Sequence, residues 1–207
     1  MLVFVGQTRS RKLIARLTEL GFGECTSRGE WPPRRYPSFQ DNGAFPDWTR
    51  GRDFDNAAFL RDCESANAAA IPPVFTVCPD RVATGLDSLA FSLDWLDSYG
   101  SRFPALRWYL AVQDGMAVSD VRAVMDRFAG IFIGGSLPWK IATGAQWVTL
   151  AHELGKPCHI GRVGTAKRVR WAMRIGADSI DSSAPLWAEA NLQRFIGALE
   201  ARQGELL

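Results

Sequence analysis

The sequence predicts an α/β fold, a compact closed (β/α)8 barrel of the TIM type. Eight short apolar runs recur along the 207 residues, and amphipathic stretches separate most of them. Runs that are apolar throughout are typical of parallel strands that are covered on both faces. The expected strands are Leu2–Val5, Phe22–Cys25, Ser38–Asp41, Val74–Val77, Trp108–Val112, Gly130–Ile133, Cys158–Gly161 and Ser179–Asp181.

The stretches between these runs predict helices. Arg11–Leu20, Ser119–Phe128 and Ala166–Ile175 each place apolar side chains three and four residues apart, which is helical spacing. Side chains that favour N-caps and glycines that favour helix ends mark further boundaries. We expect N-caps at Asp55, Asp87 and Ser119, and helix ends at Gly21, Gly100 and Gly176.

An open doubly wound sheet is the alternative fold. Its dinucleotide-binding form would place Gly-x-Gly-x-x-Gly after the first strand, and no such motif follows Val5. At roughly 150 residues per domain, we expect residues 1–207 to form a single domain. No apolar run approaches the ~20 residues of a membrane span, and the N-terminal residues lack the order of a signal peptide. We therefore expect a cytoplasmic protein with no membrane partner.

Charge and cysteine content narrow the function classes. A net charge of +2 excludes a histone-like polycation, although 20 of the 24 basic residues are arginine, which binds phosphate and guanine through a planar fork of donors. The four cysteines are Cys25, Cys63, Cys78 and Cys158, with no Cys-x-x-Cys pair and only two histidines in the chain. No structural zinc motif can be written, so we expect four reduced thiols and no metal.

Polar residues follow several expected strands where each strand ends. In a barrel, side chains at the carboxyl ends of strands converge on one site. Each aspartate alone is also a common helix cap or turn former. Two carboxylates in one cleft suit chemistry at the anomeric carbon of a sugar, and Asp with Gln can bind a purine edge. The residues are Asp41, Asp80, Gln113, Gly134, Gly135 and Asp181.

Four motifs in order carry a family resemblance. The motifs Asp41-Asn-Gly-Ala-Phe45, Val112-Gln113-Asp-Gly, Gly134-Gly135-Ser136 and Asp178-Ser-Ile-Asp181-Ser resemble those of the tRNA-guanine transglycosylases (queuine tRNA-ribosyltransferases). They resemble even more their shorter relatives from phages and bacterial modification clusters, which insert 7-deazaguanines into DNA. The resemblance runs across residues 38–187.

The resemblance implies a role for each matching residue. Asp181 would be the nucleophile that attacks C1′ of the target nucleotide, and Asp41 the acid and base that serves the leaving and incoming bases. Asp80 would hold the Watson–Crick edge of the base and Gln113 would bind O6. Gly134, Gly135 and Ser136 would hold the base and its 7-substituent. The target base must leave its stack to reach such a pocket.

The sequence also departs from the family. The tRNA enzymes carry a zinc-binding subdomain after the nucleophile, whereas here only 26 residues follow Asp181 and none is cysteine. Asn42 and Ala44 replace a serine and a glycine of the family motif, and Pro185-Leu-Trp187 replaces its Pro-Thr-Arg. Without the zinc subdomain, DNA is a better expected substrate than tRNA. The implied partners are DNA and a free 7-deazaguanine such as preQ0, in a phage-encoded or bacterial protein without cofactors; a homodimer stays open.

Basic and aromatic residues flank these motifs. The turn Gly161–Thr165 could hold a phosphate at a helix N-terminus, and we expect a nucleic-acid backbone to bind Arg162, Lys167 and Arg168, with Arg34 and Arg35 on the opposite rim. A solvated helix face is the alternative. Tryptophans in loop-like context could stack on bases, and those in amphipathic helices are expected in the core. The first group is Trp31, Trp48, Trp139 and Trp187, and the second is Trp95, Trp147 and Trp171.

The leading hypothesis is therefore a DNA base transglycosylase that exchanges guanine for a 7-deazaguanine through an aspartyl-glycosyl intermediate. One alternative is a related enzyme that acts on RNA. A second is a non-catalytic barrel that binds a deazaguanine base as a subunit of a larger enzyme. A third is a metabolic barrel whose segments Gly161–Thr165 and Gly134–Ser136 bind a phosphoryl group.

Overall fold

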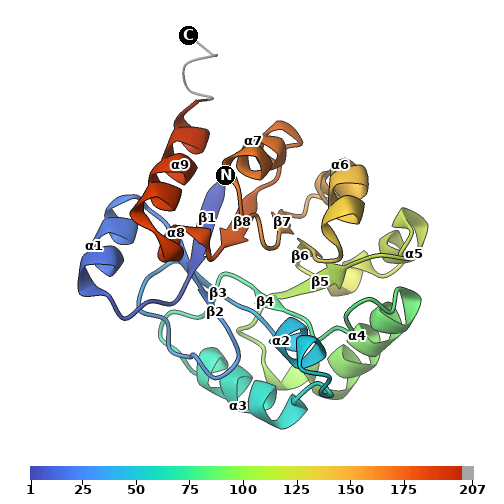
Figure 1. The fold of residues 1–207 in the computed structure, drawn as a ribbon. Helices are drawn as coiled ribbons and strands as arrows, with labels where there is room; N and C mark the ends of the chain where they lie inside the picture. Colours follow the sequence, from blue (N-terminus) through green and yellow to red (C-terminus); the bar gives the residue numbers. More distant parts are fainter. Residues whose placement is uncertain (202–207) are drawn as a thin grey trace.

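The computed structural model describes residues 1–201, and its strands form a closed barrel in chain order (Figure 1). All neighbours are parallel, and the last strand pairs with the first, Phe4 opposite Asp181. The predicted fold class, a (β/α)8 barrel, is confirmed. The strands are β1 Leu2–Gly6, β2 Gly23–Thr26, β3 Ser38–Gln40, β4 Thr76–Val77, β5 Trp108–Val112, β6 Gly130–Ile133, β7 Cys158–Ile160 and β8 Ser179–Ser182.

Helices surround the barrel (Figure 1). Gly21 and Gly176 follow two of them with φ of 68° and 84°, a conformation that glycine adopts without strain. The helices are α1 Arg11–Glu19, α2 Ala44–Thr49, α3 Asn56–Asn67, α4 Leu86–Tyr99, α5 Val118–Arg122, α6 Leu137–Glu153, α7 Ala166–Arg174, α8 Ala184–Trp187 and α9 Glu189–Glu200, with 3-10 turns at Gly100–Arg102 and Met125–Arg127.

Of the expected N-caps, Asp55 is confirmed, because its carboxylate accepts from the backbone N–H of Ala58. The other two were wrong by two residues. Helix α4 is capped at Gly85, so that Asp87 lies in its first turn, where a negative charge favours the helix dipole. Helix α5 is capped at Ala117, because Asp120 accepts from the backbone N–H of that residue.

Aromatic side chains fill the barrel interior. Phe39 stacks on Phe75 with ring centroids 4.6 Å apart, and Phe75 stacks on Tyr109 at 4.0 Å. Phe4 meets Phe39 edge-on at 4.9 Å. These offset and edge-on pairs are the favoured aromatic geometries. The interior is therefore a packed core that forms a floor beneath the carboxyl ends of the strands.

The second β/α unit has no helix. Residues 27–37 pass from β2 to β3 as an irregular loop, and the buried Arg35 side chain lies beside the barrel wall. Its Nη1 is 3.0 Å from Oε2 of Glu24, and the two side chains are 1% and 0% exposed. Arg35 Nη2 also donates to the carbonyl of Val5. The expectation that Arg35 binds nucleic acid was wrong, because its guanidinium is buried against Glu24 and is not exposed to a ligand.

Helices α2 and α3 both connect β3 to β4. Among residues 1–201, no helix is both long and apolar enough to cross a membrane.

The tryptophans expected in the core differ in burial. Trp95 and Trp147 are buried, whereas Trp171 is half-buried against the core.

Candidate active site

A small cavity lies at the carboxyl ends of the strands. Its volume is about 70 Å³. The polar residues that the sequence analysis placed at the ends of strands line it. Its lining includes Asp41, Asp80, Gln113, Gly134, Gly135 and Asp181, together with Asn42, Phe45 and Arg162.

Asp181, in β8, is held from two sides. One of its oxygens, Oδ1, accepts from Nε2 of His159 at 2.9 Å and from the backbone N–H of Arg162 at 3.2 Å. Within residues 1–201, Oδ2 accepts no hydrogen bond and is left for a ligand. His159 is fully buried, and burial lowers its pKa, although the Asp181 carboxylate opposes that shift.

His159 is the functional residue that the sequence analysis missed. It lies in β7 and its ring stacks on Phe132 at 4.9 Å, so that it belongs to the aromatic floor as well as to the site. The signal in the sequence was a histidine inside an apolar strand, two residues before Gly161 on the same face.

Asp41 follows β3 and begins the turn into α2. Its Oδ1 accepts from the backbone N–H of Gly43, and Oδ1 of Asn42 accepts from that of Ala44, both at 2.8 Å. Gly43 has a φ of 76°, and a Cβ there would lie 2.9 Å from Cβ of Arg28. A glycine is therefore required at the middle of this turn.

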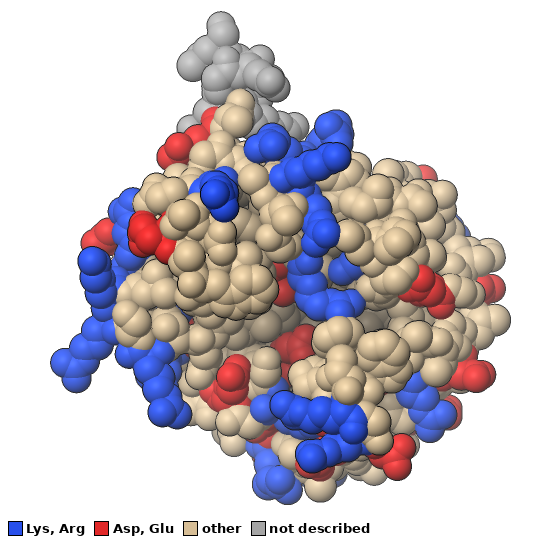
Figure 2. Space-filling model, in the orientation of Figure 1, with Lys and Arg blue, Asp and Glu red and all other residues tan. Residues whose placement is uncertain are grey.

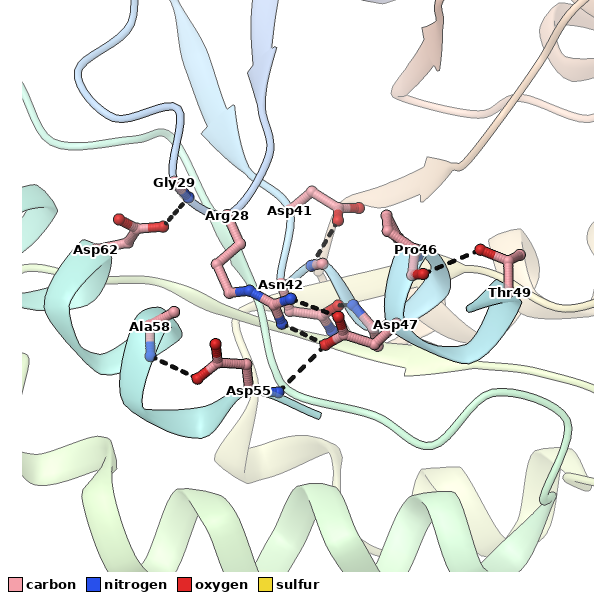
Figure 3. Close-up of polar contacts among 12 residues, drawn as sticks. Arg28, Gly29, Asp41, Asn42, Pro46, Asp47, Thr49, Asp55, Ala58 and Asp62 are labelled. Atoms are coloured by element: carbon pink, nitrogen blue, oxygen red, sulfur yellow. Dashed lines mark hydrogen bonds and ion pairs between the residues drawn. The ribbon is translucent and has the colours of Figure 1, made fainter. Parts of the chain in front are cut away.

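A buried ion pair holds helix α2 in place (Figure 3). Arg28 donates from both Nη atoms to the two oxygens of Asp47, each at 2.6 Å. Asp47 also accepts from the backbone N–H of Asp55, which caps α3. Such bidentate pairs are directional and strong. They fix the turn that carries Asp41 and the ring of Phe45 that follows it.

Asp80 and Gln113 are hydrogen-bonded to each other. Asp80 accepts from Nδ2 of Asn42 at 2.7 Å and from Nε2 of Gln113 at 2.9 Å. The same Nε2 donates to Ser88, and Oε1 of Gln113 accepts from the backbone N–H of Ala83. Both amide protons of Gln113 are thus engaged. In this arrangement Gln113 holds Asp80, and it has no donor left for O6 of a base.

Burial sets the acidity of the two neighbouring carboxyl groups. Desolvation is the main cause that raises the pKa of Asp41 to about 6, with the charges of Asp181 and Asp80 adding to it. Desolvation also raises the pKa of Asp80 to about 6, against the lowering effect of its bonds from Asn42 and Gln113. A carboxyl group with a pKa near 6 can both give and take a proton close to neutral pH.

The Gly134-Gly135 pair reaches the cavity through its backbone. A Cβ on Gly135, which has a φ of 69°, would lie 2.6 Å from Oδ2 of Asp114. Ser136 lies outside this cavity, contrary to the expectation that it binds the base. Its backbone N–H and its hydroxyl both donate to Asp114 at 2.6 Å, so that both donors of Ser136, at the N-cap position of α6, are already engaged.

Arg162 lies at the rim of the cavity. Its guanidinium lies 4.0 Å above the ring of Phe45 and donates to the carbonyl of Gly135 at 2.9 Å. The residue has a φ of 59°, which costs a non-glycine residue about 1 to 2 kcal/mol. Arg162 therefore stands next to the space that Asp41, Asp80 and Asp181 line.

Basic residues lie around the hollow in the face of the molecule that Figure 2 shows. Lys and Arg side chains run from the region of α7 to the middle of the face, and carboxylates lie at the bottom of the hollow. Lys167 is exposed and Arg168 half-buried, both in the first turn of α7. Arg34 is exposed, but its backbone N–H donates to Glu24 in mid-strand β2, which places it on the flank of the barrel.

The aromatic residues near the mouth differ in exposure. Trp48 in α2 is 52% exposed and Trp187 in α8 is 74% exposed, so both could stack on a base. Trp31 and Trp139 instead pack against the hydrophobic core.

Neither a metal site among the described residues nor a comparison with known proteins assigns a function to the cavity. In the described part of the chain, no three His, Cys, Asp or Glu side chains are grouped so that they could hold a metal ion. The four cysteines are free. No family model matches the chain, and no curated protein matches it either.

Proposed function

We propose that this protein is a nucleic-acid base transglycosylase, which exchanges guanine for a 7-deazaguanine such as preQ0 in DNA. The observation that carries the proposal is the pair of carboxylates in one cavity with different environments. Asp41 is desolvated and has a pKa of about 6, whereas Asp181 has one oxygen fixed by His159 and Arg162. Such a pair separates the proton carrier from the nucleophile.

In the first half of the reaction, Oδ2 of Asp181 attacks C1′ of the target nucleotide. The bond from C1′ to N9 of guanine breaks, and the protonated Asp41 gives its proton to the leaving base. The products are free guanine, a glycosyl ester on Asp181 and an ionised Asp41. The His159 donor stays on Oδ1 throughout and orients the carboxylate, which is the positioning that covalent catalysis requires.

In the second half, a 7-deazaguanine replaces guanine in the cavity. The ionised Asp41 takes the proton from N9 of the incoming base as N9 attacks C1′, and the ester bond to Asp181 breaks. Asp41 is again protonated and Asp181 again ionised, so the cycle closes without an oxidant or a reductant. The backbone of Gly134 and Gly135 and the carboxyl group of Asp80 line the space that a base would occupy.

The basic surface around the hollow supports a nucleic-acid substrate over a free nucleoside. Lys and Arg side chains surround the acidic centre on this face (Figure 2), and a phosphate backbone is attracted by such a rim. The alternative substrate is RNA, and a non-catalytic base-binding subunit is the alternative outside enzymes.

An exchange assay tests the proposal. Radiolabelled guanine or preQ0 is offered with duplex DNA, single-stranded DNA and tRNA in parallel, and the nucleosides are analysed after digestion. We expect label in DNA with the wild type and none with Asp181→Asn. Asp178→Asn is the matched control, because Asp178 follows α7 outside the cavity and contacts His152.

Any other outcome would contradict the substrate, the mechanism or the enzymatic activity that we propose. Label in tRNA alone would replace DNA by RNA as the substrate. Undiminished exchange by Asp181→Asn would exclude the covalent mechanism. Base binding without label in any polymer would favour the non-catalytic subunit.

A further inference from the structure

A second, larger cavity opens beside the first at the mouth of the barrel. Its volume is about 390 Å³. It shares Phe45, Gly135 and Arg162 with the small cavity, so that a group bound here would lie next to the base site. Helix α6 begins at its wall.

Positive charge dominates the lining of this second cavity. Lys140, Arg162 and Arg168 all reach it, and Asp114 is its one carboxylate. Both oxygens of Asp114 already accept from Ser136 at 2.6 Å. None of the three cations forms an ion pair within residues 1–201. The lining of the cavity therefore carries three positive charges against one carboxylate, and Asp181 is the other acidic group that acts on Lys140.

Lys140 is the most unusual of the three cations, because it is only 4% exposed. Its Nζ donates to the carbonyl of Gly161 at 2.5 Å, which leaves two of its three N–H donors without an acceptor among residues 1–201. Burial is the main cause that lowers its pKa to about 8, and the neighbouring Arg162 adds to the shift. Buried charges in proteins are normally paired, so an anionic partner is expected.

Two further features indicate the shape of that partner. The N-terminus of the 17-residue helix α6 adds partial positive charge on the same wall. The rings of Phe45 and Trp48, which are 39% and 52% exposed, form another wall of the cavity. A tetrahedral oxyanion with an adjoining flat ring matches this combination of cations and aromatic faces.

We propose that this cavity binds a phosphate group of the nucleic-acid strand next to the target nucleotide, through Lys140, Arg162 and Arg168. The assignment to a strand rests on the proposed function, whereas a free mononucleotide or inorganic phosphate would offer the same chemistry. Arg162 lines both cavities, so binding of phosphate here gives its guanidinium an alternative to Phe45 and Gly135. The phosphate would thus draw Arg162 from the mouth of the base cavity.

The test compares Lys140→Met with the wild type by calorimetric titration. The probes are a single-stranded deoxyoligonucleotide, a set of the same oligonucleotide with one phosphate at a time replaced by methylphosphonate, dGMP, deoxyguanosine and inorganic phosphate. Lys156→Met is the matched control, because Nζ of Lys156 also donates to a backbone carbonyl, that of Phe128, before the start of β7. Lys140→Arg keeps the positive charge and tests whether charge alone is enough for phosphate binding.

We expect Lys140→Met to lose roughly tenfold in affinity for the oligonucleotide, as for the loss of one charge-assisted bond. The slope of log affinity against log salt should fall by about one. One methylphosphonate position should weaken binding by the wild type more than binding by Lys140→Met, which keeps Arg162 and Arg168. Lys156→Met should bind as the wild type does, and unfolding curves establish that each variant is folded.

The remaining outcomes distinguish a phosphate of the strand from a free phosphate. They also distinguish failure of the phosphate site from failure of the proposed function. Lys140-dependent binding of dGMP or inorganic phosphate, with unchanged oligonucleotide binding, would assign the site to a free phosphate and overturn the strand. Equal binding of every probe by Lys140→Met would overturn the site itself. Lys140-dependent oligonucleotide binding by a protein that exchanges no base would sink the proposed function and keep the phosphate site.

Discussion

Nε2 of His159 lies 2.9 Å from Oδ1 of Asp181, and Nδ1 of the same ring lies 2.8 Å from the hydroxyl of Ser179. Full burial lowers the pKa of His159, which favours the neutral ring. A carboxylate only accepts, so Nε2 carries the proton and Nδ1 accepts from Ser179. The ring thereby locks one oxygen of Asp181 and keeps its orientation.

The first prediction concerns this bond. We expect His159→Phe, which keeps the ring on the aromatic floor but removes the donor, to slow base exchange by roughly 10- to 100-fold. A hydrogen bond to a charged group contributes about 1.5 to 3 kcal/mol, and each 1.36 kcal/mol is about tenfold in rate. Exchange kinetics should show the loss in kcat rather than in the KM for the base.

The control for that variant is His152→Gln. His152 pairs with Asp178, and both side chains are more than 40% exposed. Its replacement should leave the rate unchanged. A wild-type rate for His159→Phe would mean that Asp181 needs no positioning by the ring.

The second prediction links pH to stability through Asp41. Its pKa of about 6 in the folded protein exceeds the ordinary 3.8, so the folded state binds the proton more tightly than the unfolded state. The contribution of Asp41 to the free energy of unfolding therefore falls as pH rises from about 4 to about 6 and stays reduced above that. Asp41→Asn should remove this penalty and stabilise the protein at pH 8 by about 1 to 3 kcal/mol, while abolishing exchange.

Urea unfolding of Asp41→Asn at pH 4 and pH 8 checks this expectation. The gain should be present at pH 8 and absent at pH 4, where the wild-type carboxyl group is also neutral. Asp94→Asn, on the exposed side of α4, is the surface control. An equal gain at both pH values would show that charge on Asp41 is not its cause.

The third prediction distinguishes the adjacent arginines in the loop after β2. Arg35→Ala leaves Glu24 buried without its partner and should cost about 3 to 5 kcal/mol. Arg34→Ala removes an exposed side chain and should change stability by less than about 0.5 kcal/mol. The double variant Arg35→Met with Glu24→Met should recover much of the loss. Comparable small effects of both single variants in urea unfolding would contradict the buried pair.

The fourth prediction concerns the backbone of Arg162. Glycine tolerates the observed φ of 59°, whereas alanine retains its steric cost. Arg162→Gly should therefore be more stable than Arg162→Ala by about 1 kcal/mol, although both lose the guanidinium. Equilibrium unfolding of the two variants side by side measures this difference, and the reverse order would place residue 162 in another conformation.

Local sequence patterns predicted the barrel because β1, β5 and β6 are apolar runs and the segments between strands have helical spacing. The ends of several strands shifted by a residue or two, as at β4, where Val74 and Phe75 precede the two paired residues. Asp41, Asp80 and Asp181 could be placed together because parallel strands bring their carboxyl ends to one rim. Their roles in exchange stay predictions.

The remaining site features depend on contacts between distant segments. Gln113 was placed correctly by its strand, but its engagement with Asp80, Ser88 and Ala83 is visible only in three dimensions. Arg35 belongs in the same category, because its burial follows from the missing helix between β2 and β3. No local pattern reveals that a loop leaves room for an arginine.

The Arg162 contact with Phe45 and Gly135 has a consequence for the integrity of the nucleic acid. For an enzyme of the proposed kind, water that attacks the glycosyl ester in place of a base would leave an abasic lesion in the strand. Arg162 is exposed and lines the cavity together with Asp181, so its position would affect how readily water or the incoming base reaches that ester. Fidelity would then depend on how the timing of Arg162 movement compares with hydrolysis, so that one side chain separates modification of the strand from damage to it.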